Sequence, residues 1–153
     1  MSQATLIQQV TLVNEGQIQI TDVLIEGERI QKIGSIPAQD QYHLVDGRGK
    51  YLFPGVIDGQ VHFRDPGLTH KADLTSESKA AIAGGVTSFI EMPNTRPNTL
   101  TLELWADKYE LASTKSLANY GFLLGITADN LDEVIQWDTS KHLAITDDGL
   151  YFT

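Results

Sequence analysis

Two polar clusters in the first two thirds of the sequence hold side chains that could do chemistry. In residues 59–67, GQVHFRDPG, the side chains of Gln60, His62 and Arg64 stand two positions apart. Alternate residues of a strand point to one face, so we expect these three together at a strand end. His62 could bind a metal, and Arg64 offers a planar pair of donors for a carboxylate. A strand end with solvated or hydrogen-bonded side chains would show the same pattern.

The second cluster, residues 91–97 (EMPNTRP), follows the next apolar run. Two prolines fix its backbone, and the Asn94 amide can both donate and accept hydrogen bonds. A third cluster, TDDG at residues 146–149, places Asp147 beside Asp148, and paired carboxylates suit a hard metal ion. The second cluster also fits an ordinary strand-to-helix turn, and the third is a common turn sequence.

The elements that must position these clusters change in character at Pro54. Residues 5–53 alternate short β-rich runs with turn residues, which predicts hairpins. After Pro54, strand and helix patterns alternate. Helices are expected at about 75–83, after 99 and at 129–137, and strands at 56–57, 86–90, 120–124 and 142–146. This order predicts a parallel sheet with helices outside it, as either an open doubly wound sheet or a (β/α)8 barrel.

Each polar cluster directly follows a predicted strand. The carboxyl ends of parallel strands meet at one end of a sheet. We therefore expect His62, Arg64 and Asn94 to lie at the same end of the sheet. At least one of Asp147 and Asp148 should lie there too.

Composition narrows the classes of function. The chain has 153 residues, about one domain, with 41% hydrophobic and 20% charged residues, as in globular proteins. Its formal net charge of −9 would repel nucleic acids and anionic membranes, and no apolar run could cross a bilayer. We expect neither partner. The start lacks a signal-peptide pattern, so the cytoplasm is the expected location. With no cysteine, the candidate metal ligands are His, Asp and Glu.

Three stretches in this order, YLFPGVIDGQVHFRDPGLTHKA, AAIAGGVTSFIEMPNTRPNT and ANYGFLLG, resemble dihydroorotase of the amidohydrolase superfamily. The resemblance implies an α/β fold with a partial (β/α)8 TIM-type barrel, about its first four βα units, at residues 54–153. A small antiparallel β-sandwich module would precede it at residues 1–53. The implied reaction is the metal-dependent, reversible hydrolysis of dihydroorotate to N-carbamoyl-aspartate in pyrimidine biosynthesis.

The resemblance also implies roles for single residues. His62 matches the second histidine of a zinc-binding His-x-His pair, and Gln60 stands where the first would be. Arg64 matches the residue that receives the substrate carboxylate, and Asn94 matches its hydrogen-bonding partner. The implied ligand is therefore a small anion, dihydroorotate or carbamoyl-aspartate.

The third cluster is similar to a different branch of the family. There a TDDG segment replaces the carboxylated lysine that bridges two metal ions in many relatives, so Asp147 or Asp148 is implied as a metal ligand. The family binds one or two zinc ions. The sequence upstream of the fourth strand resembles one branch of the family, and the fourth strand resembles the other. This mixture is also consistent with a rearrangement near Lys141.

The family places two more histidines and a catalytic aspartate on strands five, six and eight. A full barrel needs roughly 250 residues, so we expect the 153-residue chain alone to be inactive. The sheet edge at residues 142–146 would lack a partner, so the chain alone should self-associate or be only marginally folded. One alternative is a non-catalytic dihydroorotase-like scaffold or binding partner of aspartate carbamoyltransferase. Another is a fragment with no role of its own.

Overall fold

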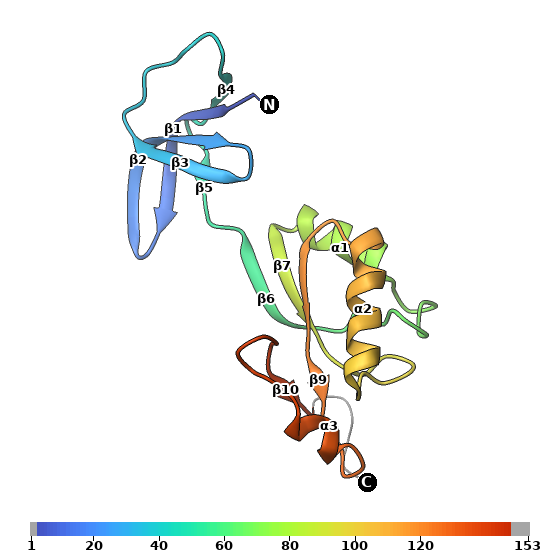
Figure 1. Ribbon diagram of the computed structural model, residues 1–153. Coiled ribbons are helices and arrows are strands. Elements are labelled where there is room, and N and C mark those ends of the chain that lie inside the picture. The colour runs from blue at the N-terminus through green and yellow to red at the C-terminus, as the bar shows by residue number, and fades with distance from the viewer. Residues whose placement is uncertain (1–2, 148–153) are drawn as a thin grey trace. The chain divides into compact units, whose positions relative to one another are not determined.

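The computed structural model describes residues 3–147 (Figure 1). The chain divides into two compact units, Met1–Pro54 and Gly55–Thr153, called the N-terminal and C-terminal units below. Each unit forms its own β-sheet structure. Among the described residues, no helix has the length and apolar character needed to cross a membrane.

The N-terminal unit is a five-stranded sheet in the order β3-β2-β1-β4, with β5 also paired to β1. The strands are β1 (Thr5–Asn14), β2 (Gln17–Glu26), β3 (Arg29–Gly34), β4 (His43–Asp46) and β5 (Tyr51–Leu52). The predicted hairpins are β1–β2 and β2–β3, both antiparallel. However, β4 and β5 run parallel to β1, so the wholly antiparallel module that we expected is wrong. Residues 35–42 carry the chain from one sheet edge to the other, and β4 thereby enters in the direction of β1.

The C-terminal unit is built on a parallel sheet in the order β6-β7-β8. Its elements are β6 (Val56–Val61), α1 (Leu74–Ala83), β7 (Val86–Glu91), α2 (Leu102–Lys115) and β8 (Asn119–Phe122). In β7 and β8, Phe89 pairs with Tyr120 in parallel register. The predicted parallel arrangement of segments 86–90 and 120–124 is therefore confirmed.

The chain then continues through β9 (Leu124–Gly125), α3 (Leu131–Ile135) and β10 (Ile145–Thr146). β10 pairs with β9 in parallel. The strand predicted at 142–146 is shorter than expected because residues 138–142 form a turn. In this turn, the Lys141 and His142 N–H groups both donate to the Asp138 carbonyl.

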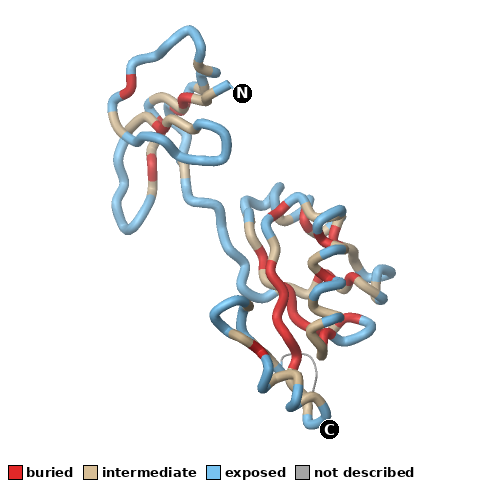
Figure 2. The backbone as a smooth tube through the Cα atoms, viewed as in Figure 1, coloured by how far each residue is buried: buried red, intermediate tan, exposed pale blue. Residues whose placement is uncertain are grey.

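The core of the C-terminal unit lies between its sheet and helices. Figure 2 shows the buried backbone concentrated along the central strands of this unit. The cluster combines aromatic and aliphatic side chains from the strands, helices and connecting loops: Phe63, Leu74, Phe89, Ala112, Ala118 and Phe122. Both long helices begin at side-chain caps. Asp73 accepts from the Ser76 N–H at 2.7 Å, and Thr101 accepts from the Leu104 N–H at 3.2 Å.

Candidate active site at the ends of two parallel strands

The loops that follow β6 and β7 contact each other directly. The Met92 N–H donates to the Val61 carbonyl at 3.0 Å, and the Arg96 N–H donates to the Pro66 carbonyl at 3.1 Å. Gly67 makes this approach possible: its φ is +85°, and a Cβ there would collide with the Arg96 carbonyl oxygen. The first two sequence clusters are therefore held together as one structural site.

His62 and Asn94 meet across these loops. His62 Nδ1 lies 2.9 Å from Asn94 Oδ1, and both side chains are partly buried. Because an amide oxygen accepts, Nδ1 is the donor in this contact, and Nε2 is the other ring nitrogen. A hydrogen bond of this kind at one ring nitrogen orients a histidine that binds a metal ion or a proton through the other ring nitrogen. The structure thus brings these two residues together, while their roles in binding stay predictions.

Arg64 lies in the same loop but not on a strand. β6 ends at Val61, and Arg64 has a φ of +69°, in the left-handed region that non-glycine residues rarely adopt. The expectation that Gln60, His62 and Arg64 share one strand face by alternation is therefore wrong. The Arg64 N–H instead turns toward the Glu91 carboxylate, which accepts it through Oε1 at 3.0 Å.

Glu91, the last residue of β7, forms a buried ion pair with Lys108 on α2. Their side chains are 1% and 2% exposed, and Lys108 Nζ lies 2.9 Å from Glu91 Oε2. The hydrogen bond of the Lys108 ammonium group goes to the Met92 carbonyl, at 3.3 Å. The same group lies 4.8 Å from the centre of the Phe122 ring. Glu91 Oε2 is thus paired by charge without a well-aligned hydrogen bond.

Burial changes the ionisation of both partners. Burial raises the pKa of the Glu91 carboxyl, and the adjacent Lys108 ammonium works against that rise. Burial likewise lowers the pKa of Lys108, and Glu91 acts in the opposite direction. Each group therefore depends on the other to remain charged.

Sequence reasoning missed this pair, although both residues interrupt apolar patterns. Glu91 ends the strand VTSFIE, and Lys108 falls between Trp105 and Ala112 on the helix face that packs on the sheet. The sequence signal that could have found this ion pair is a charged residue at a core position of a strand together with a second charged residue on the adjoining helix.

A second ion pair anchors the β6–α1 loop. Asp65 is buried and accepts from Lys115 Nζ at 2.7 Å and from the Leu74 N–H at 3.3 Å. Lys115 is seven residues beyond Lys108, about two helical turns along α2. One helix therefore sends two lysines to two acids, one in the β6–α1 loop and one at the end of β7.

The remaining predicted ligands do not complete a metal centre. Gln60 is exposed on β6, Asp147 is exposed after β10, and Asp148 lies outside the described residues. Within residues 3–147, no group of three His, Asp or Glu side chains is placed to hold a metal ion. A hydrolytic zinc needs about three protein ligands. Residues 3–147 therefore do not by themselves supply a complete zinc site.

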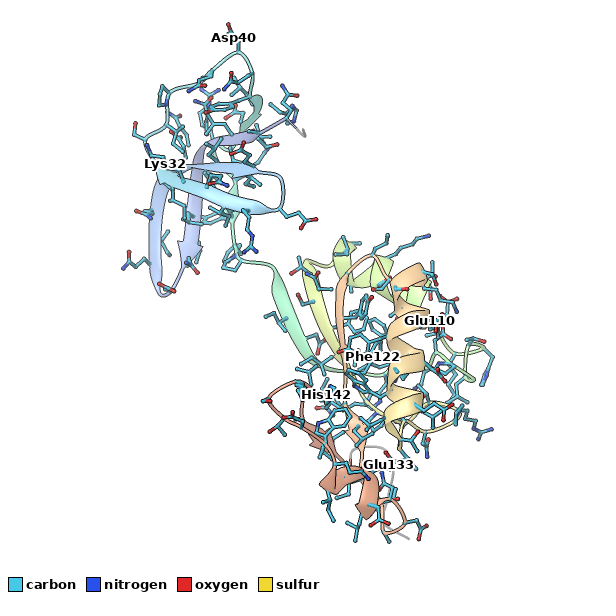
Figure 3. The ribbon with its side chains drawn as sticks, viewed as in Figure 1. Lys32, Asp40, Glu110, Phe122, Glu133 and His142 are labelled. Atoms are coloured by element: carbon cyan, nitrogen blue, oxygen red, sulfur yellow. The ribbon has the colours of Figure 1, made fainter. Side chains whose placement is uncertain are left out.

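An aromatic cluster attaches the segment after β9 to α2. The His142 ring lies 4.7 Å from the rings of both Trp105 and Trp137, measured between centroids. Trp105 Nε1 donates to the Phe122 carbonyl at 2.9 Å, and Trp137 Nε1 donates to the Leu143 carbonyl at 2.6 Å. Figure 3 shows His142 and Phe122 in this part of the C-terminal unit. His142 is thus a packing residue rather than a member of the site.

Comparisons with known proteins show the family to which this chain belongs. A model of the family described as Dihydro-orotase-like matches residues 49–153, so the chain belongs to that family. The chain is 37% identical over 143 residues to a dihydroorotase from Carboxydothermus hydrogenoformans, covering 92% of this chain and 33% of that protein. It is 38% identical over 114 residues to an allantoinase from Desulfitobacterium hafniense, covering 74% of this chain and 25% of that protein.

Solved structures agree in fold. The L-hydantoinase (dihydropyrimidinase) from Arthrobacter aurescens superposes with a TM-score of 0.84 at 26% identity, over 92% of this chain and 32% of that one. The D-hydantoinase from Bacillus sp. AR9 superposes with a TM-score of 0.79 at 28% identity, over 97% of this chain and 35% of that one. The chain spans about a third of the length of these relatives. By their names, they are cyclic amidohydrolases.

Proposed function

We propose that this chain provides the substrate-carboxylate side of a dihydroorotase-type active site. The reaction would be the reversible hydrolysis of dihydroorotate to N-carbamoyl-aspartate in pyrimidine biosynthesis. The observation that carries the proposal is the 2.9 Å contact between His62 and Asn94, with Arg64 in the same loop, in a chain of the dihydro-orotase-like family.

The proposed roles follow from the chemistry of each side chain. The Arg64 guanidinium would bind the substrate carboxylate through two parallel hydrogen bonds. Asn94 already uses Oδ1 to orient His62, so its NH₂ group would donate to a substrate oxygen. In the hydrolysis, water adds to the ring carbonyl, the C–N bond breaks and the ring nitrogen takes a proton. Residues 3–147 contribute binding and orientation to that step.

The proposed function also involves a bound metal and a barrel architecture. His62, Gln60 and one of Asp147 and Asp148 remain the proposed zinc ligands. The parallel order β6-β7-β8 and the likeness to L-hydantoinase support the proposal that these strands, with β10, begin a (β/α)8 barrel. The β module of residues 1–53 would be a separate domain from residues 54–153.

The chain alone should not hydrolyse dihydroorotate, even with added zinc. No general base is identified among the described residues, and such a base is typically worth about 10²–10⁴-fold in rate. Ring opening can be followed by chromatography of N-carbamoyl-aspartate. Turnover that disappears in Arg64→Ala would show that this chain completes the catalytic site on its own.

Binding tests the proposed function more directly. Arg64→Ala should weaken binding of N-carbamoyl-aspartate about 10–100-fold, because a hydrogen-bonded charge pair contributes about 1.5–3 kcal/mol. Titration calorimetry would measure the change. Arg48→Ala is the matched control, since Arg48 is an exposed arginine of the N-terminal unit that pairs with Asp46. Equal losses in both variants would contradict the assignment.

Self-association is proposed through the edge strand β6. Its residues Val56 and Ile57 are 53% and 69% exposed, and in the described sheet this strand pairs with β7 alone. Sedimentation should show concentration-dependent mass, and Ile57→Lys should reduce it. A monomer at all concentrations would refute this expectation.

A scaffold function is the second candidate, because the ligands within residues 3–147 do not complete a zinc site. The partner proposed for it is aspartate carbamoyltransferase. Co-sedimentation with that enzyme, together with the absence of stoichiometric zinc, would favour the scaffold. Stoichiometric zinc that is lost in His62→Ala would favour the enzyme.

A further inference from the structure

We infer that the buried Glu91–Lys108 pair positions Arg64 for anion binding, by holding its backbone in the left-handed conformation. Glu91 and Lys108 would then be positioning residues that set affinity for the substrate carboxylate without touching it. This inference rests on the proposed function of Arg64.

The two oxygens of the Glu91 carboxylate face different partners. Oε1 accepts the Arg64 N–H at 3.0 Å, while Oε2 lies 2.9 Å from Lys108 Nζ. Lys108 in turn is fixed by the Met92 carbonyl and the Phe122 ring. A continuous polar connection therefore runs from α2, through the end of β7, to the loop that carries Arg64.

The Arg64 backbone lies in the left-handed region. A φ of +69° is unfavourable for a side chain with a Cβ and persists only where neighbouring groups fix it. Here the N–H is held by Glu91, and the carbonyl accepts the Leu68 N–H at 3.0 Å. Because this residue leaves the direction of β6, its φ decides where the guanidinium can reach. A change at Glu91 should therefore redirect Arg64.

Packing alone does not require charged residues at these two buried positions. A buried ion pair is often no more stabilising than an apolar pair of the same volume. Glu91 and Lys108 are almost fully buried, so packing alone could be served by leucine and methionine. What an apolar pair could not supply is an acceptor for the Arg64 N–H. That acceptor is the specific contribution of Glu91.

The test is the double variant Glu91→Leu/Lys108→Met, which removes the acceptor without leaving a buried charge. We expect it to fold and to bind N-carbamoyl-aspartate at least about tenfold more weakly than the unmodified chain. Glu91→Gln keeps an amide oxygen for the Arg64 N–H and should retain most of the affinity. Unchanged affinity in the folded double variant would overturn the inference.

A second readout does not depend on ligand. In ¹⁵N-correlated NMR spectra, loss of the carboxylate hydrogen bond should move the Arg64 amide proton upfield, and Glu91→Gln should move it less. An unmoved Arg64 signal in the double variant would contradict the inference. If the unmodified chain binds no N-carbamoyl-aspartate, the proposed function fails, while the Arg64 signal still decides whether Glu91 holds this backbone.

A thermodynamic cycle covers the case in which the double variant does not fold. Glycine adopts positive φ without steric strain, so adding Arg64→Gly to Glu91→Leu/Lys108→Met should reduce the destabilisation of the double variant or restore its folding. Equal destabilisation with and without Arg64→Gly would show that Glu91 does not hold this conformation.

Discussion

Lys108→Met is expected to lower the free energy of unfolding by about 3–5 kcal/mol, because removing one partner leaves the other charge buried and unpaired. Denaturant unfolding followed by circular dichroism would measure the loss. Lys79→Met is the matched control, since Lys79 is an exposed lysine of α1, and it should change stability by no more than about 0.5 kcal/mol. Equal effects at the two lysines would mean that the buried pair is not needed for stability.

The loss in Lys108→Met should depend on pH in a defined direction. The buried Glu91 carboxyl has a folded-state pKa above its ordinary value of 4.5, and removing Lys108 raises it further. The folded chain then binds more protons than the unfolded chain, so its stability falls as pH rises through the folded pKa. The deficit should be largest at neutral pH and above and shrink on acidification toward 4.5. A deficit that grows on acidification would contradict this account.

Gly67→Ala is expected to separate the two loops of the site. The new Cβ would face both a positive φ and a collision with the Arg96 carbonyl. Gly85→Ala is the matched control, because Gly85 has a similar φ of +89° but open space around its missing side chain. We expect Gly67→Ala to be about 1–3 kcal/mol more destabilising than Gly85→Ala.

The same pair of variants tests function. If the proposed binding site depends on contact between the loops, Gly67→Ala should also lose affinity for N-carbamoyl-aspartate, while Gly85→Ala should not. Chemical denaturation and titration calorimetry would provide the two measurements. Similar stability and affinity in both variants would show that neither folding nor binding depends on the close approach of the two loops at Gly67.

The sequence predicted the parts of the fold that depend on local pattern. The helices near Leu74–Ala83 and Leu102–Lys115 and the parallel strands that alternate with them follow from periodicity and capping residues. The parallel pairing of β4 and β5 with β1 was missed. Pairing across a sheet depends on how the intervening chain crosses, which short-range pattern does not encode.

For the site, placing His62 near Asn94 required only that parallel strands share an end. The conformation of Arg64 could not be predicted, because it depends on a carboxylate 27 residues away in the sequence. The Glu91–Lys108 pair likewise depends on the rotation of α2 over the sheet. Tertiary contacts, rather than residue type, therefore decide how the predicted arginine is presented.

The aromatic cluster around His142 makes one unit of this chain separately visible by fluorescence. The chain has two tryptophans, Trp105 and Trp137, and both belong to the C-terminal unit, with ring centroids 5.5 Å apart. Their emission therefore reports on the contact between α2 and the segment after β9. Backbone circular dichroism senses both units. A difference between the two unfolding curves would measure how independently the units melt.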